Sequence, residues 1–67
     1  MNQYEGPKIS LKAARVNAGL TIQQVADKLG ITRQTVARYE NGKSNPDSSV
    51  VMEMCRLYNM PIQFIFL

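Results

Sequence analysis

The side chains best suited to specific hydrogen bonding lie in residues 32–40, TRQTVARYE. If the segment is a helix, one face carries four residues that are spaced at i, i+1, i+4 and i+5: Arg33, Gln34, Ala37 and Arg38. Arginine and glutamine carry planar groups that can form two hydrogen bonds at once with a matching partner. The small Ala37 lets this face lie close against a surface. The sequence therefore predicts a binding face with two guanidinium groups and one carboxamide.

A second helix is expected directly before this one. Thr21 and Gln24 form a capping-box pattern, in which the hydroxyl accepts a backbone N–H and the glutamine side chain reaches back to the cap. The helix should therefore begin at Ile22. Its apolar residues recur on one face: Ile22, Val25, Ala26 and Leu29. Gly30 is expected to end it, since glycine accepts the left-handed conformation found after helix ends.

The helix that carries the binding face has its own start and stop signals. Thr32 is the expected N-cap, and Asn41 with Gly42 should end the helix after residue 40. Val36 and Tyr39 are expected to point toward the core. Two short helices joined by a glycine turn, as in residues 20–42, have the arrangement of a helix-turn-helix.

Two further helices flank this pair. Ser10 can cap a helix over residues 11–18, with Gly19 as its stop. The inner face of this helix should be narrow, formed by Leu11, Ala14 and Ala18. Asp47, after Pro46, can cap a helix over residues 48–58, whose apolar residues fall at helical spacing: Val50, Val51, Met54, Cys55, Leu57 and Tyr58. The expected fold is all-α.

The length and the charge limit the possibilities. A chain of 67 residues with 45% hydrophobic residues has room for one domain with a small core. The net charge is +3, and seven of the eight Lys/Arg residues lie in residues 1–43, against three of the five acidic residues. The basic part contains the helix pair, as expected of a protein that binds a polyanion. A basic surface that is simply solvated would give the same distribution.

The absence of histidine and the single cysteine exclude several kinds of chemistry. Cys55 cannot form a disulfide within the chain, and no Cys/His cluster is available for zinc. No histidine can serve as a base for a nucleophile, so neither an enzyme, a metal nor a cofactor is expected. We expect Cys55 to be a small buried hydrophobic residue. No apolar run approaches the roughly 20 residues that cross a bilayer, so a cytoplasmic protein without a membrane partner is expected.

The order and spacing of these features resemble the Cro/repressor-type (XRE-like) helix-turn-helix transcriptional regulator family. The matching features are an arginine at 15, G-L-T at 19–21, Ala26, Gly30, Val36, Y-E-N-G-K at 39–43, a proline and a closing helix pair. They extend from about residue 11 to residue 66. The resemblance implies a compact five-helix lambda-repressor-like DNA-binding domain with a central helix-turn-helix, here residues 9–67. Residues 1–8, in which Gly6 and Pro7 stand among scattered polar residues, are expected to form a flexible arm.

The resemblance also implies roles for individual residues. Base contacts in the major groove are expected from Arg33, Gln34, Thr35, Ala37 and Arg38. Phosphate contacts are expected from Arg15, Gln23, Thr32, Asn41 and Lys43. Arg15 is also the expected partner of Glu40 in a structural ion pair, unless it is a surface arginine without a fixed partner. Ile22 departs from the family, which often has a polar residue there to meet a phosphate.

The segment 61–67 is unusually apolar. A closing helix would turn Ile62, Ile65 and Phe66 inward and leave Phe64 and Leu67 outside, which suggests a dimer contact. An extended strand that pairs with its copy is the competing interpretation. Either way the expected dimer interface consists of Ile62, Phe64, Ile65 and Leu67. The apolar residues could instead pack on their own domain, or a longer protein could continue past Leu67.

Together these features predict a dimeric, sequence-specific repressor that binds double-stranded DNA at a palindromic operator. The partners expected are DNA and a second copy of the chain. The alternative is an antitoxin or regulator whose main role is to bind another protein, such as an antagonist, through the apolar C-terminal tail.

Overall fold

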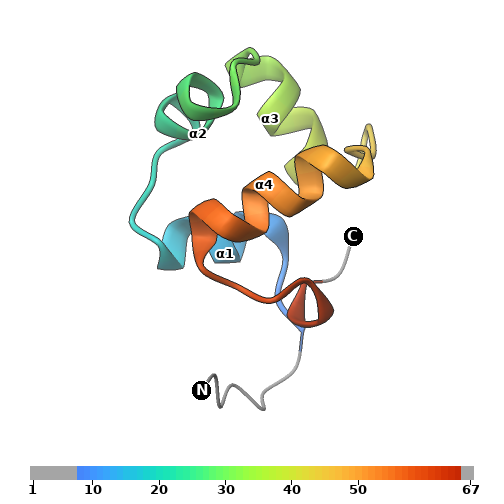
Figure 1. Ribbon diagram of the computed structural model, residues 1–67. Coiled ribbons are helices and arrows are strands. Elements are labelled where there is room, and N and C mark those ends of the chain that lie inside the picture. The colour runs from blue at the N-terminus through green and yellow to red at the C-terminus, as the bar shows by residue number, and fades with distance from the viewer. Residues whose placement is uncertain (1–7, 66–67) are drawn as a thin grey trace.

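The computed structural model describes residues 8–65, which form four α-helices and one short 3-10 helix. The α-helices are α1 (Leu11–Asn17), α2 (Ile22–Leu29), α3 (Arg33–Glu40) and α4 (Ser48–Tyr58), and η1 (Ile62–Phe64) follows them. Figure 1 shows α2 and α3 at one end of the molecule, α4 crossing its middle, and α1 behind α4. The expected N-terminal arm lies almost wholly outside the described residues.

Every α-helix begins at the cap that the sequence predicts. The side chains of Ser10, Thr21, Thr32 and Asp47 each accept a hydrogen bond from the backbone N–H three residues later. Thr21 also completes its capping box, because the Gln24 side chain accepts from the Thr21 N–H at 2.8 Å. These bonds satisfy backbone donors that have no partner within the helix.

The helices end where a residue can leave the right-handed conformation. Gly30, with φ +71°, ends α2 and starts the turn into α3, and the backbone N–H of Ile31 closes this turn by donating to Ala26 at 3.0 Å. Helix α1 ends at Asn17, one residue earlier than predicted. Ala18 is therefore exposed, and its expected place on the inner face is wrong. Arg15 takes the place on that face instead.

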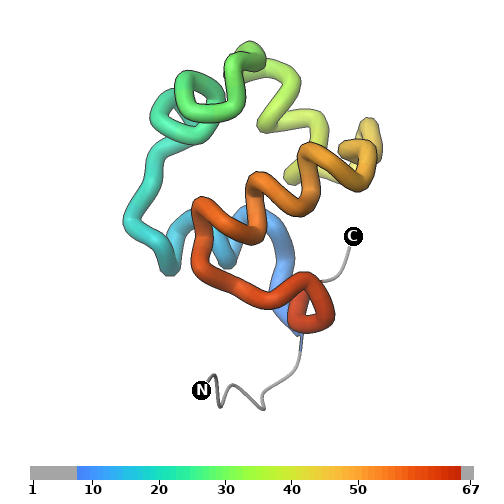
Figure 2. Tube along the Cα trace, in the orientation of Figure 1, coloured from blue at the N-terminus to red at the C-terminus, as the bar shows by residue number. Residues whose placement is uncertain are grey.

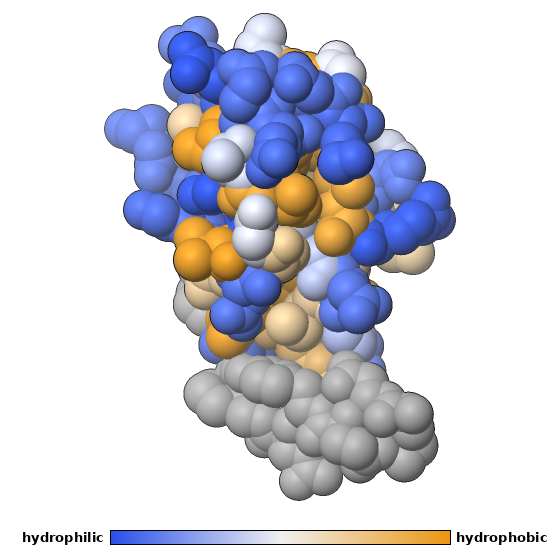
Figure 3. All heavy atoms as spheres, turned by 90° about the vertical axis from the view of Figure 1, so that its left-hand side faces the viewer, coloured by the Kyte–Doolittle hydropathy of each residue, from blue (hydrophilic) through white to orange (hydrophobic). Residues whose placement is uncertain are grey.

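The core lies where the four α-helices converge. Its fully buried members come from every one of these helices: Leu11, Ala14, Val25, Ala26, Val36, Met54 and Tyr58. The tube in Figure 2 shows α4 lying across the space that α1, α2 and α3 surround. Cys55 is only half-buried at the edge of this core, and burial raises the pKa of its thiol. A domain of this size leaves part of its apolar surface uncovered, as the band of hydrophobic residues in Figure 3 shows.

The fifth helix of the expected fold is a single 3-10 turn. Pro61 stands at its N-cap without a side-chain hydrogen bond, and Ile65 after it is extended, with φ −113° and ψ 128°. Ile65 forms a parallel β-bridge with Ile9, whose backbone N–H donates to the Phe64 carbonyl at 2.9 Å. Residues 64–65 therefore pair with the N-terminal part of the chain at Ile9, where the expected fold has a longer helix.

The tail side chains lie differently from the prediction. Ile62, expected to point inward, is 44% exposed, and Phe64, expected to be left outside, is half-buried. Ile65 is only 4% exposed and belongs to the core of its own domain. Its expected place in a dimer interface stays a prediction, and in a single copy the side chain packs within its own domain. Phe66 and Leu67 lie outside the described residues.

Candidate nucleic-acid interface

Helix α3 presents the polar face that the sequence predicts. Arg33, Gln34 and Arg38 are exposed, and Ala37 lies half-buried on the same helix. Val36 on the opposite side is fully buried and holds α3 against the core. Val25 and Ala26 of α2 belong to the same buried cluster as Val36, so the two helices pack against each other. The exposed face is therefore held on a rigid support.

A groove runs between the beginnings of α2 and α3. One wall comes from the residues before and within the first turn of α2, and the other from the cap and exposed face of α3. Thr32, Arg33, Gln34 and Ala37 line this second wall. Ile22, the departure from the family pattern, lies on the opposite wall and is half-buried. The first turns of both helices, whose positive dipole ends favour anions, thus line one depression.

Arg15, which also lines this groove, forms a nearly buried ion pair with Glu40. Its Nε donates to Glu40 Oε2 at 2.7 Å and its Nη2 to Oε1 at 3.3 Å, while Nη1 donates to the Leu20 carbonyl at 2.9 Å. The exposed fractions of the two side chains are 10% and 4%. The hydrogen bond to Glu40 raises the pKa of Arg15, although burial acts in the opposite direction. Arg15 therefore has a fixed partner and joins α1 to α3.

Arg38 is held by a contact that the sequence did not reveal. Its Nε donates to Ser44 Oγ at 3.1 Å, and the Ser44 backbone N–H donates to the Arg38 carbonyl at 3.3 Å. Both Nη groups remain available for a bidentate contact. Ser44 follows a turn at Gly42, with φ +75°, that folds the chain back beside the helix. No sequence motif marks a serine at this spacing as a partner of Arg38.

The residues expected to contact phosphates have different surroundings. Asn41 and Lys43 are exposed beyond the end of α3. The Thr32 hydroxyl lies 2.9 Å from that of Thr35 and caps α3. Gln23 donates from Nε2 to Asp27 Oδ1 at 2.8 Å on the surface of α2, so its amide must turn to reach a phosphate.

Within residues 8–65, no three His, Cys, Asp or Glu side chains gather as they would around a metal ion. In the same part of the chain, no helix is long and apolar enough to cross a membrane.

Comparison with known proteins finds helix-turn-helix transcriptional regulators that are similar to this chain in sequence. A helix-turn-helix family model matches residues 11–65. The chain is 36% identical over 55 residues to the SPbeta prophage-derived uncharacterized HTH-type transcriptional regulator YonR of Bacillus subtilis, covering 82% of this chain and 51% of that protein. It is 33% identical over 55 residues to the HTH-type transcriptional regulator ImmR of the same organism, covering 82% of this chain and 43% of ImmR.

A smaller relative matches over nearly its whole length. An uncharacterized HTH-type transcriptional regulator of Methanocaldococcus jannaschii is 33% identical over 60 residues, which is 90% of this chain and 91% of the relative. The chain thus spans about half of YonR, less than half of ImmR and most of the archaeal protein. The comparison with solved structures found no match.

Proposed function

Because this chain belongs to the Cro/repressor-type helix-turn-helix family of DNA-binding transcriptional regulators, we propose that it is a dimeric repressor that recognises a palindromic operator through the major groove. The observation that supports this most is the exposed face of α3, on which Arg33, Gln34 and Arg38 stand together around Ala37.

The proposed base contacts follow from the hydrogen-bonding capacity of this face. Arg33 and Arg38 can each donate two hydrogen bonds to O6 and N7 of a guanine, and Gln34 can pair with N6 and N7 of an adenine. Ser44 occupies only Nε of Arg38, which leaves both Nη groups for the base. Ala37 lets the helix approach the base edges, and the half-buried Thr35 can offer its methyl group to a thymine.

The proposed phosphate contacts set the position of α3 in the groove. Lys43 and Asn41 lie after α3, and Thr32 and Gln23 lie at the beginnings of α3 and α2, so contacts from both ends hold the helix in register. Arg15 contributes mainly by fixing α1 against α3, since three of its N–H donors are already used within the domain.

One recognition helix contacts only a few base pairs. Specific binding therefore requires two copies on a two-fold-symmetric operator, with half-sites about 10 base pairs apart. A dimer of this kind represses by occupying its site.

Selection of bound duplexes from a random pool, followed by titration at two salt concentrations, tests this function. A palindromic consensus with strong salt dependence is expected, because phosphate contacts release counterions. Lack of enrichment over random DNA would contradict the proposal and favour a role in binding another protein.

Two substitutions test the division between base and phosphate contacts. Arg33→Ala should cost about 1 to 3 kcal/mol of operator affinity and relax the preference at one base pair of each half-site. Lys43→Ala should weaken operator and random duplexes alike and lower the salt dependence. Binding isotherms on both duplexes measure the difference, and equal losses in the two variants would show that these roles are misassigned.

A further inference from the structure

The loop that follows α3 folds back on the last turn of that helix. Gly42 has φ +75°, and after it the backbone N–H groups of Lys43 and Ser44 both donate to the Arg38 carbonyl, at 2.9 Å and 3.3 Å. The Ser44 hydroxyl accepts a hydrogen bond from Arg38 Nε at 3.1 Å. Ser44 therefore contacts Arg38 twice, once at its main chain and once at its guanidinium.

This contact distinguishes the two arginines of the exposed face of α3. Arg33 and Arg38 are both exposed, but within residues 8–65 a side-chain hydrogen bond holds Arg38 and none holds Arg33. A long side chain without a partner adopts many rotamers and loses this freedom when it binds. Ser44 is itself half-buried. It therefore restricts the Arg38 side chain before any ligand arrives.

We propose that Ser44 is a positioning residue for sequence recognition, which holds the Arg38 guanidinium in the orientation where both Nη groups meet one guanine. This inference rests on the proposed function and deepens it. It assigns part of the sequence preference to a residue that lies outside α3 and reads no base itself.

The bond to Ser44 selects one of two ways in which an arginine can bind a guanine. The guanidinium fork can face O6 and N7 either with Nε and one Nη group or with both Nη groups. Because Nε of Arg38 already donates to Ser44, the edge formed by the two Nη groups is the one left for the base. The acceptor lies on the Nε edge, so the Nη edge points away from the loop. A guanidinium fixed in this way cannot turn freely to suit a different base.

A serine next to a lysine assigned to a phosphate has a second possible role. Its hydroxyl could bind a phosphate directly, and that contact would carry no sequence information. The bond from Arg38 Nε to Ser44 Oγ favours the positioning role. The two roles differ in a measurable way, because positioning requires Arg38 and a phosphate contact does not.

A double-mutant cycle on the selected operator tests this requirement. Ser44→Ala alone should weaken operator binding about three- to tenfold, which is the effect of one hydrogen bond. In the Arg38→Ala background the same substitution should change binding less than about twofold, since the side chain that Ser44 positions is gone. Ser44→Thr keeps the hydroxyl and should bind like wild type. Equal losses from Ser44→Ala in both backgrounds would overturn the positioning role and assign Ser44 to a phosphate.

Selection of duplexes from a random pool locates the effect on the operator. Arg38→Ala should relax the preference at one base pair of each half-site. Ser44→Ala should relax the preference at that same base pair and keep the preference at all others. Relaxation at a different base pair, or at none, would overturn the proposal.

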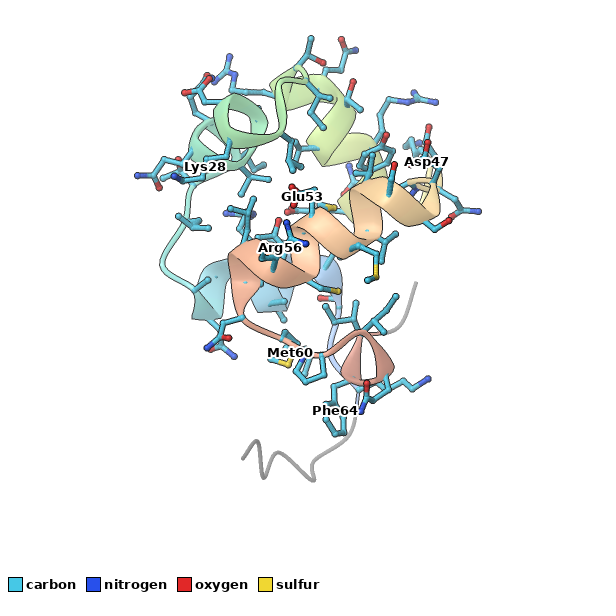
Figure 4. All side chains as sticks on the ribbon, viewed as in Figure 1. Lys28, Asp47, Glu53, Arg56, Met60 and Phe64 are labelled. Atoms are coloured by element: carbon cyan, nitrogen blue, oxygen red, sulfur yellow. The ribbon has the colours of Figure 1, made fainter. Side chains whose placement is uncertain are left out.

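Ser49→Ala is the matched control for both experiments. Ser49 is an exposed serine in the first turn of α4, and its hydroxyl donates to Asp47 Oδ1 at 3.0 Å. Figure 4 labels Asp47 at the beginning of α4. The control removes one hydroxyl and one side-chain hydrogen bond but leaves the Arg38 contact intact, so it should match wild type in affinity and preference. Circular dichroism of every variant establishes that it remains folded.

The outcomes separate this proposal from the proposed function. If the wild-type chain selects an operator and Ser44→Ala keeps the full preference at every base pair, the role of Ser44 is overturned and the sequence-specific regulator stands. If the wild-type chain enriches no sequence, the proposed function is overturned, and the role of Ser44 with it.

Discussion

Arg15 is a charged residue that is almost completely buried in the domain. Its three hydrogen bonds to Glu40 and to the Leu20 carbonyl connect α1 with α3 and with the turn before α2. The guanidinium remains charged at every accessible pH, so Glu40 is needed as its counter-charge. This pair fixes the end of α3, and its loss should destabilise the whole domain.

Glu40→Ala should therefore destabilise the domain by about 3 to 5 kcal/mol, because it leaves Arg15 buried without a partner. Urea denaturation measures the loss. Asp27→Ala is the matched control, since it removes an exposed carboxylate on α2 and should cost no more than about 1 kcal/mol. Similar losses in the two variants would show that the Arg15–Glu40 pair is no stronger than a surface contact.

Tyr58 is the second buried polar residue of interest. Its hydroxyl lies inside the core without a hydrogen-bond partner among the described residues. Burial, together with the nearby Glu40 carboxylate, raises the pKa of Tyr58 to about 12. In the unfolded chain the phenol ionises near pH 10. The folded state therefore keeps the proton where the unfolded state loses it, and this contribution to stability is present below pH 10 and disappears toward pH 12.

Tyr58→Phe should remove this part of the alkaline destabilisation. At pH 7 the variant should be as stable as wild type or up to about 1 kcal/mol more stable, since it eliminates an unpaired buried hydroxyl. Between pH 10 and 12 the wild type should lose stability relative to the variant. Urea denaturation of both proteins across this range gives the difference, and parallel pH profiles would contradict the shifted pKa.

The residue contacts differ in how far the sequence could predict them. The Arg15–Glu40 pair followed from the resemblance, because both residues stand at positions that the family pattern relates. The bond from Arg38 to Ser44 did not, since it depends on how the loop after Gly42 folds back. Arg33, Gln34 and Arg38 could be placed on one face from spacing alone, but periodicity gives no information about what holds each side chain.

At the scale of the elements, local signals were sufficient for the helices. Thr21, Thr32 and Asp47 are capping residues directly before apolar runs of helical period, and all three helices begin at the residue after the cap. The end of the chain lacked such signals. The β-bridge between Ile9 and Ile65 depends on packing between segments far apart in sequence, so local patterns could not reveal it.

The cap of α2 offers a test of this reasoning. Thr21→Ala should destabilise the domain by about 1 kcal/mol, because it removes the side-chain acceptor for the Gln24 N–H and breaks the capping box. Thr21→Ser keeps the hydroxyl and should remain close to wild type. Urea denaturation compares the three proteins. A serine variant as unstable as the alanine variant would mean that the cap bond does not determine the stability of α2.

At the scale of the whole molecule, the two ends of the described chain meet and complete the core. The Ile9 N–H donates to the Phe64 carbonyl, and Ile65 packs against the core to which all four α-helices contribute. Small domains have little apolar area to bury, so each core side chain carries a large share of the stability. In the segment after α4, Ile65 thus closes the domain, whereas Ile62 stays exposed.

Ile65→Ala should separate closure of the domain from docking of a second copy. The substitution should cost about 2 to 5 kcal/mol through lost burial and a cavity, whereas Val16→Ala, at an exposed position, should change stability by no more than about 0.5 kcal/mol. Thermal unfolding is measured at several protein concentrations, because a dimer becomes more stable as concentration rises. Ile65→Ala should lower the unfolding temperature at every concentration but keep its dependence on concentration. If the unfolding temperature of Ile65→Ala no longer depended on protein concentration, Ile65 would have to be part of the dimer interface.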